Sequence, residues 1–387
     1  MKGHIRKRGK SSWTVYIYRG RGAEGKERYD THTVRGSKQD AEDERVRQLN
    51  KLAEGSYVDP SRLTVGKFLP QWLRDYAKPN VAPKTYERYE EIARLHLIPN
   101  LGEHRLQKLG PMHIQTYYSN ALRTGRKDGR EGGLSPQTVR HHHRVLHLAL
   151  KQAVRWQLLS RNPADSVEPP RVPHREMSVL DERELSSLLK RAADSRIYIP
   201  VLLAATTGMR RGEVLGLHWS DVDLDRGVVV VQRSLSTTRG GSMEKETKSH
   251  RGRRSVTLLS VAVDALRSHK AAQARARLQL GPLYDDRDLV CARPNGTHLD
   301  PGKLSSAFGA LIRESGLPTI RFHDLRHTHA THLMKLNVHP KVVSERLGHS
   351  TIGITLDTYS HVIPGMQGEA AQKLDRALKL AANKAPR

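Results

Sequence analysis

The sequence predicts a multidomain α+β protein: a small β-sheet plus a helix at the N-terminus, an all-α middle domain, and a mainly α C-terminal domain with a small antiparallel sheet. Three observations predict this. The 387 residues exceed what one hydrophobic core usually organises. The hydrophobic pattern changes from alternation to helical periodicity near residue 63, and prolines cluster after residue 160. These breaks place the domains at residues 1–56, 63–160 and 175–387.

The first domain is predicted from two short strands and one helix. Apolar and polar side chains alternate over residues 12–19, and residues 27–34 are similar after a glycine-rich turn. Ser37 is a good N-cap for a helix that continues to about Glu54, where Gly55 ends it. We therefore expect a compact, basic module that ends near residue 56.

The middle domain has the periodicity and start signals of four helices. Proline opens three of them, as expected in a first helical turn. The helices are predicted over residues 64–77, 83–98, 111–123 and 136–156. The basic, glycine-rich loop at residues 124–133 is either a mobile connector or a loop that contacts the backbone of a bound polyanion. Four prolines within residues 162–173 forbid a continuous helix and predict an extended linker.

The third domain begins after this linker. From Ser178 the pattern predicts two helices, a strand pair at residues 227–235 and 254–258, and further helices to the end of the chain. A last helix at residues 366–382 has apolar side chains at helical spacing. Its apolar face suits packing on a neighbouring protomer or on its own domain, and the sequence leaves both open.

The charge balance indicates a polyanionic partner. Lys and Arg total 66 against 40 acidic residues, a net charge of +26, and an excess of this size favours nucleic acid. Membrane surfaces are also anionic, but no apolar run approaches the ~20 residues that span a bilayer, and the longest, residues 197–205, contains Pro200. Cys291 is the only cysteine, which excludes an intrachain disulfide and a thiolate metal cluster and fits a reducing cytoplasm.

Five groups of polar residues in the C-terminal domain carry the functional signal. In Thr-Gly-Met-Arg-Arg-Gly-Glu, Arg210 follows a glycine turn at a helix start, where an arginine can face an anion. In His-Asp-Leu-Arg-His-Thr, the three-residue spacing puts His323 and Arg326 on one helical face, so one ligand could meet both. His349 follows a helix end in Leu-Gly-His-Ser, and Tyr359 lies ten residues further on in Asp-Thr-Tyr-Ser-His.

The fifth group is Thr-Lys-Ser, with Lys248 between the two predicted strands. Each group alone has an ordinary explanation as a helix cap, a helix end or a solvated hairpin tip. Together, in this order and spacing, they give a sequence that resembles the tyrosine recombinases of the phage integrase family. The resemblance covers essentially the whole chain and is strongest over residues 178–365.

The resemblance implies a role for each of these residues. Arg210 and Arg326 match the two arginines that clamp the phosphate, and His323 and His349 match the two active-site histidines. Tyr359 matches the nucleophile of a site-specific DNA recombinase, which cleaves and rejoins strands through a 3′-phosphotyrosyl intermediate.

Two further positions complete the set that the resemblance implies. Lys248 matches the hairpin lysine of the family; Lys245 lies close enough to compete for this role, but the Thr-Lys-Ser context favours Lys248. Glu213 matches a supporting acidic position.

The residue types suit this chemistry. Two guanidiniums that bind the non-bridging oxygens of a phosphodiester stabilise the charge that develops during displacement. A tyrosine hydroxyl with an ordinary pKa of about 10 needs a base, for which His323 is the candidate. Lys248 can protonate the departing 5′ oxygen, His349 would hold a phosphate oxygen, and Glu213 would orient neighbouring cations. Because a phosphotyrosine keeps the bond energy, we expect no cofactor.

The resemblance extends to the other domains and to the partners. The stretch from Ile5 to Val15 resembles the arm-type DNA-binding domain of many integrases, and residues 63–160 resemble the helical, SAM-like core-binding domain, which leaves residues 175–387 as the catalytic domain. The implied partner is double-stranded DNA with core and arm-type attachment sites, bound by four protomers, with a host bending protein and an excision factor as accessories. The enzyme would integrate or excise a mobile genetic element in the bacterial cytoplasm, on the nucleoid and not on a membrane.

Other interpretations are weaker. A type IB topoisomerase uses similar side chains but relaxes supercoils without exchanging strands between two sites, and the arm-like module argues against it. A DNA-binding regulator that keeps the fold without the chemistry is disfavoured by the complete catalytic set. The histidines at 141–143 and at 327, 329 and 332 invite a zinc site, but no HExxH motif occurs and adjacent helical histidines point in different directions, so we expect no metal.

Overall fold

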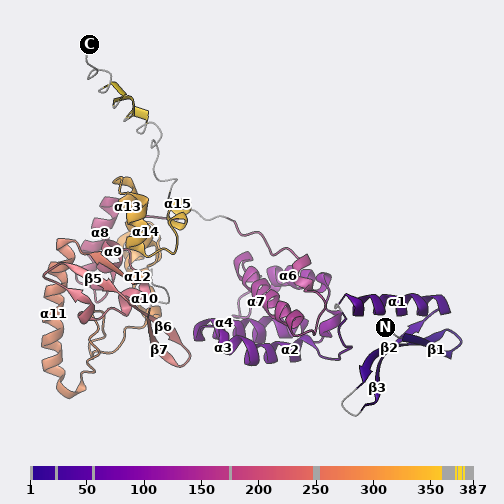
Figure 1. The fold of residues 1–387 in the computed structure, drawn as a ribbon. Coiled ribbons are helices and arrows are strands. Elements are labelled where there is room, and N and C mark those ends of the chain that lie inside the picture. Colours follow the sequence, from indigo (N-terminus) through magenta and orange to yellow (C-terminus); the bar gives the residue numbers. More distant parts are fainter. Residues whose placement is uncertain are drawn as a thin grey trace. The chain divides into compact units, whose positions relative to one another are not determined.

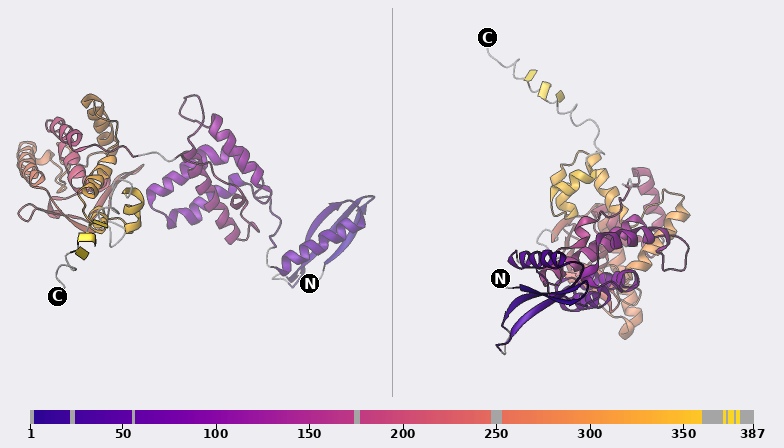
Figure 2. Two further views of the ribbon diagram at one scale, coloured as in Figure 1. Left: turned by 90° about the horizontal axis from the view of Figure 1, so that it is seen from above. Right: turned by 90° about the vertical axis from the view of Figure 1, so that its right-hand side faces the viewer.

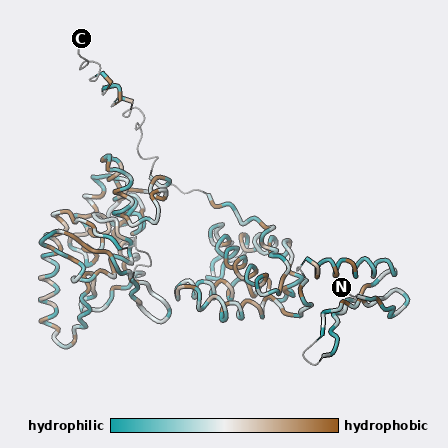
Figure 3. The backbone as a smooth tube through the Cα atoms, viewed as in Figure 1, coloured by the Kyte–Doolittle hydropathy of each residue, from teal (hydrophilic) through white to brown (hydrophobic). Residues whose placement is uncertain are grey.

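The computed structural model describes residues 3–21, 25–54, 57–173, 177–246 and 253–359, together with residues 371–372, 374–376 and 378–379. The chain separates into two compact units, Met1–His174 and Arg175–Arg387 (Figure 1). Each unit has its own hydrophobic core, and apolar segments gather in the interior of each (Figure 3). None of the described helices combines the length and apolarity that a membrane crossing requires.

The first unit begins with a three-stranded antiparallel sheet in the order β1-β2-β3, formed by Gly3–Gly9, Ser12–Arg21 and Glu27–Arg35. Helix α1, Lys38–Ala53, lies along one face of this sheet (Figure 2), and the Ser37 side chain caps it as predicted. Val15, Ile17 and Ala41 form the small core between them. Strand β1 was not predicted from hydrophobic alternation, because it is an edge strand of mostly exposed, basic residues that bury little apolar surface.

The rest of this unit is helical. The elements are α2 (Val65–Trp72), α3 (Lys78–Asn80), α4 (Pro83–Ile92), α5 (Ile98–Leu101), a 3₁₀ turn (Leu106–Lys108), α6 (Pro111–Thr124) and α7 (Pro136–Arg155). Two predicted helices run further than expected, because π-helical turns at Leu73–Ala77 and Ala93–Leu97 join α2 to α3 and α4 to α5. A π turn bonds each amide to a carbonyl five residues back, and the chain thereby continues helically past the prolines that follow each turn.

The predicted linker is only partly extended. One turn of 3₁₀ helix, Pro163–Ser166, opens it, with Asn162 accepting a hydrogen bond from the Ala164 amide. Val167 is buried against the helical core of the first unit. The segment from Asn162 to Val167 is therefore part of the first unit.

The second unit is mainly helical with two small antiparallel sheets. Its helices are α8 (Glu182–Ala192), α9 (Tyr198–Thr207), α10 (Arg211–Leu215), α11 (Ser260–Leu280), α12 (Pro301–Ser315), α13 (Asp324–Lys335), α14 (Pro340–Leu347) and α15 (Ile352–Tyr359), with 3₁₀ turns at Trp219–Asp221 and Gly281–Leu283. One sheet has the order β4-β5-β8, formed by Val222–Asp223, Val228–Val231 and Arg254–Thr257. The other is the hairpin of β6 (Arg233–Thr238) and β7 (Gly241–Glu246).

The predicted strand pair is confirmed in part. Strands β5 and β8 pair antiparallel within the two predicted ranges. The first range, residues 227–235, is interrupted at Gln232, after which the chain enters the β6–β7 hairpin that the pattern did not predict. The strands of this hairpin are largely polar and half-exposed, which gives them little hydrophobic signal.

Helix α9 fixes the position of the candidate site. Every residue from Ile199 to Thr207 is buried, because α9 packs against α8, α10, α11 and α13. Such a helix shows no amphipathic stripe in the sequence. Its C-terminal end, which leads through Gly208 to Arg210, is therefore held rigidly by the core.

Candidate active site

Two glycines end the helices that border the site. Gly208 caps α9 at φ 68° and Gly348 caps α14 at φ 67°, in the left-handed region that favours glycine. A Cβ at Gly208 would lie 2.6 Å from the Leu347 side chain, so space as well as backbone conformation requires glycine there. Their carbonyls accept hydrogen bonds from two arginines: Arg326 Nη1 bonds Gly208 at 2.7 Å, and Arg210 Nη2 bonds Gly348 at 3.2 Å.

Arg210 stands at the N-cap of α10 with an extended backbone. Glu213, three residues on, accepts from its backbone amide at 2.9 Å and from Nη1 at 2.7 Å. The Arg210 side chain is 41% exposed, so solvent and solutes can approach it. Arg210 is thus both anchored and accessible to an anion.

Arg326, in the first turn of α13, is 3% exposed. Its Nη2 is buried and has no hydrogen-bond partner among the described residues. Burial, together with the positive charge of Arg210, lowers the Arg326 pKa to about 9, so the guanidinium is still charged at neutral pH. A buried, charged donor without a partner is costly unless an anion completes its bonding.

Tyr359 ends α15 and is 1% exposed. Its hydroxyl forms a 2.7 Å hydrogen bond with His327 Nδ1. Burial raises the Tyr359 pKa to about 12, although the Arg326 charge opposes the rise. Burial and the neighbouring His323 lower the His327 pKa to about 4, so His327 is neutral at pH 7 and Nδ1 can accept the tyrosine proton.

The structure distinguishes the histidines that the sequence could not rank. His323 is the exposed N-cap residue of α13, whereas Arg326 is buried. The His323 ring lies edge-on to the His327 ring with centroids 5.3 Å apart, and the Tyr359 hydroxyl bonds His327. His349 follows α14, and its Nδ1 bonds Thr355 Oγ1 at 2.8 Å. Burial and the charges of Arg326 and Arg210 lower the His349 pKa to about 4.

The sequence pattern does not single out His327, which is one of three nearby histidines at positions 327, 329 and 332. The other two have separate partners: His329 Nδ1 bonds the Ala205 carbonyl at 3.0 Å, and His332 Nε2 bonds the Leu180 carbonyl at 2.8 Å. Among the described residues no three ligating side chains gather to hold a metal ion. The only available signal was adjacency to Arg326, which did not reveal a contact 32 residues away.

The lysine of the hairpin cannot be placed in the same way. Lys248 lies outside the described residues. Lys245 is described and lies on β7, opposite Ser234 of β6. The assignment of Lys248 remains a prediction.

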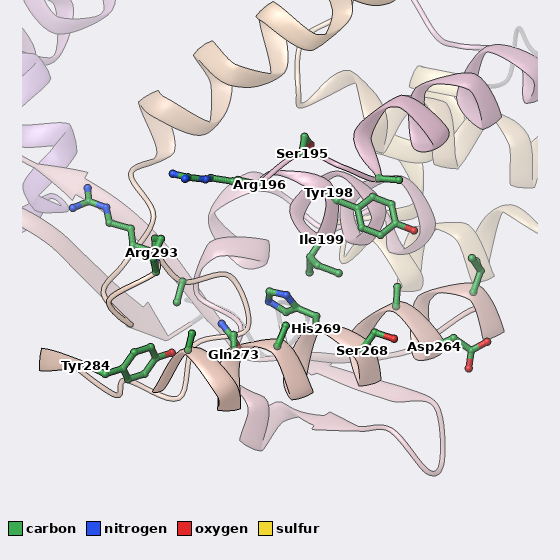
Figure 4. A pocket seen from close by; sticks show the side chains of 17 residues that line it. Ser195, Arg196, Tyr198, Ile199, Asp264, Ser268, His269, Gln273, Tyr284 and Arg293 are labelled. Carbon is green, nitrogen blue, oxygen red and sulfur yellow. The ribbon is translucent and has the colours of Figure 1, made fainter. Parts of the chain in front are cut away.

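A separate cavity of about 790 Å³ lies between α9 and α11 (Figure 4). Tyr198 and Ile199 line one side, and His269 and Gln273 of α11 line the other. His269 Nε2 bonds the Val290 carbonyl at 2.8 Å, so this histidine has a structural partner. None of the described residues that line this cavity belongs to the candidate active site.

Comparison with known protein families matches both units. The phage integrase family model matches residues 178–365, and the phage integrase N-terminal SAM-like domain matches residues 64–122. A tyrosine recombinase XerC-like protein of Caldanaerobacter subterraneus subsp. tengcongensis is 28% identical over 392 residues, which cover 95% of this chain and 97% of that protein.

Solved structures establish the same fold. The Tn1549 transposon integrase in complex with a circular intermediate DNA has a TM-score of 0.67 at 21% identity, covering 81% of this chain and 99% of that one. A lambda integrase tetramer bound to a Holliday junction has a TM-score of 0.55 and covers 92% of this chain and 94% of that one. Fold and family matches together define an enzyme of the tyrosine recombinase class. The chain belongs to the phage integrase family.

Proposed function

We propose that this protein cleaves and rejoins double-stranded DNA at specific sites with Tyr359 as the nucleophile, and so integrates or excises a mobile element. One observation carries the proposal: the Tyr359 hydroxyl is bonded to a neutral histidine, in the same site as the buried Arg326, whose Nη2 has no described partner. Such a site can bind a phosphate and activate a hydroxyl beside it.

The two arginines would bind the scissile phosphate. Arg326 would supply its unpaired Nη2, and Arg210, whose side chain is 41% exposed, would supply its guanidinium. His349 would donate to a third position on the phosphate through the ring nitrogen that does not bond Thr355. Charge on the non-bridging oxygens grows in the transition state, and preorganised donors stabilise it there more than in the ground state.

Two proton transfers accompany the strand cleavage. The Tyr359 oxygen forms a bond to phosphorus while its proton passes to His327, directly or onward to His323. The bond from phosphorus to the 5′ oxygen breaks, and Lys248 protonates that oxygen as it leaves. Rejoining reverses both transfers with a 5′ hydroxyl from the partner strand, so the sum of bonds is unchanged and no cofactor is needed.

The partners and domains follow from the same proposal. Residues 1–56 would bind arm-type sites, residues 63–160 would bind the core site, and residues 175–387 would carry the chemistry. Four protomers would act on two duplexes, in line with the lambda integrase tetramer on a Holliday junction. A host bending protein and an excision factor would set the direction of the reaction. We place it in the bacterial cytoplasm, on the nucleoid.

The direct test is Tyr359→Phe on a duplex that carries the attachment site taken from the DNA flanking the gene. This variant should bind the duplex normally but form no covalent adduct, because only the attacking oxygen is removed. Tyr198→Phe, which changes a tyrosine of the separate cavity, is the matched control and should form the adduct at the normal rate. An adduct from Tyr359→Phe would rule out Tyr359 as the nucleophile.

The role of Lys248 is tested by changing the leaving group. Lys248→Ala should cleave ordinary DNA very slowly, whereas a duplex with sulfur in place of the bridging 5′ oxygen should restore much of the rate, because a thiolate leaves without a proton. Sulfur should restore Arg326→Ala far less. If sulfur instead restores the cleavage rate of Lys245→Ala, then Lys245 is the general acid.

A further inference from the structure

An arginine outside the predicted set, Arg254, links several parts of the candidate active site. It is the first residue of β8, and its side chain is 6% exposed. Its Nη2 donates to Glu213 Oε2 at 2.7 Å, and its Nε donates to the Arg346 carbonyl at 2.7 Å. One side chain thus connects the strand after the hairpin, the first turn of α10 and the end of α14.

The same two bonds support the surroundings of Arg210 and His349. Glu213 presents one carboxylate oxygen to Arg254 and the other to Arg210 Nη1, at 2.7 Å each. A Cβ at Gly348 would lie 2.9 Å from Arg254 Nη1, so the guanidinium packs directly against the turn that leads to His349. A shift of the Arg254 side chain would therefore alter the positions of both Arg210 and His349.

The charges explain why two arginines meet one carboxylate. Glu213 is 4% exposed, and a buried carboxylate is stable only when paired. With Arg254 in place, its charge is shared between two guanidiniums, and Arg210 keeps donors for another anion. Without Arg254, Arg210 would be the remaining described cation on Glu213, and a tighter ion pair would draw it away from the substrate.

We propose that Arg254 is a positioning residue for DNA cleavage, which balances the charge of Glu213 so that Arg210 stays available to the phosphate and which fixes the turn before His349. Arg254 acts through these residues and does not touch the reacting atoms. The inference rests on the proposed function, in which Arg210 and His349 contact the scissile phosphate.

The test compares Arg254→Met, Glu213→Gln and the double variant by the rate at which each forms the covalent adduct on the attachment-site duplex. Arg254→Met should slow adduct formation by about tenfold to a hundredfold, as is typical when a supporting group behind a directly acting residue is lost. Adding Glu213→Gln should then raise the rate severalfold above that of Arg254→Met, because a neutral amide no longer holds Arg210. Such suppression is a coupling that a merely structural role does not produce.

Two controls keep the result interpretable. Arg233→Met removes a different ion pair of the same unit, between Arg233 and the Asp221 side chain, which is 2% exposed. This variant should form the adduct at nearly the wild-type rate. Arg254→Lys keeps a cation beside Glu213, should react faster than Arg254→Met, and serves if the methionine variant does not fold.

The proposal fails if the double variant is no faster than Arg254→Met while both unfold at the same temperature as Arg233→Met. Equal rates for Arg254→Lys and Arg254→Met would likewise contradict the charge argument. Failure of the proposed function would look different, because wild-type protein would then form no adduct in the same gel.

Discussion

Replacement of Arg326 by methionine should make the protein more stable and nearly inactive. Arg326 is 3% exposed, its charge is near that of Arg210, and its Nη2 has no described partner. Methionine has a similar length, is flexible and carries no charge to desolvate. A site that binds phosphate is expected to be destabilised in the free protein, because its donors are positioned for an absent anion.

The magnitude follows from the pKa and from one hydrogen bond. The fall from 12.5 to about 9 corresponds, at about 1.36 kcal/mol per pKa unit, to roughly 5 kcal/mol by which the folded protein disfavours the charged form. At pH 7 the group is charged whether folded or unfolded, so the whole penalty applies; it lessens only as pH rises from about 9 towards 12.5. Loss of the bond to the Gly208 carbonyl opposes the gain by about 1–3 kcal/mol. A net gain of roughly 2–4 kcal/mol remains.

Urea unfolding at pH 7 without DNA measures the stability, and adduct formation measures the activity. Arg326→Met should unfold at higher urea concentration than wild type and cleave at least about a hundredfold more slowly, as expected for loss of a charge-stabilising donor. Arg321→Met is the control, because Arg321 lies just before the same helix but has a side chain that is 80% exposed, and this variant should give no gain in stability. If Arg326→Met is less stable than wild type, the charge is not strained and the argument from burial is wrong.

Three further outcomes are expected. His327→Gln should slow adduct formation by about a hundredfold or more and His323→Gln by less, because His327 bonds the Tyr359 hydroxyl. A larger loss for His323→Gln than for His327→Gln would identify His323 as the immediate base. Burial lowers the His142 pKa to about 3, so the unfolded chain binds more protons than the folded protein between pH 6.5 and 3, and stability falls as the pH drops through this window. From pH 6.5 to 5 the loss of stability is at most about 2 kcal/mol. Urea unfolding at pH 7 and pH 5 should show a smaller loss of stability for His142→Gln than for the wild type. Deletion of residues 1–56 should leave cleavage of a short core-site duplex intact but abolish integration into DNA with distal sites, and normal integration would contradict the arm-binding role.

The sequence alone determined features that depend on neighbouring residues. The Ser37 cap and the proline-opened helices were predictable because a capping side chain bonds an amide three residues away and a proline acts on its own turn. The order of motifs likewise indicated the family, which the family matches confirm. The π turns were not predictable, because no residue type marks them.

Tertiary structure decided which side chains meet. Arg326 bonds a carbonyl 118 residues earlier, Arg254 bonds Glu213 across 41 residues, and Tyr359 bonds His327 rather than His323 across 32. Hydrophobic periodicity reports which face of an element is buried, but it does not report what lies opposite a polar side chain. The buried charge of Arg326 and the pairing of two arginines with Glu213 arise because core packing around α9 brings these distant segments together. That packing depends on many contacts between distant residues, which no short motif contains.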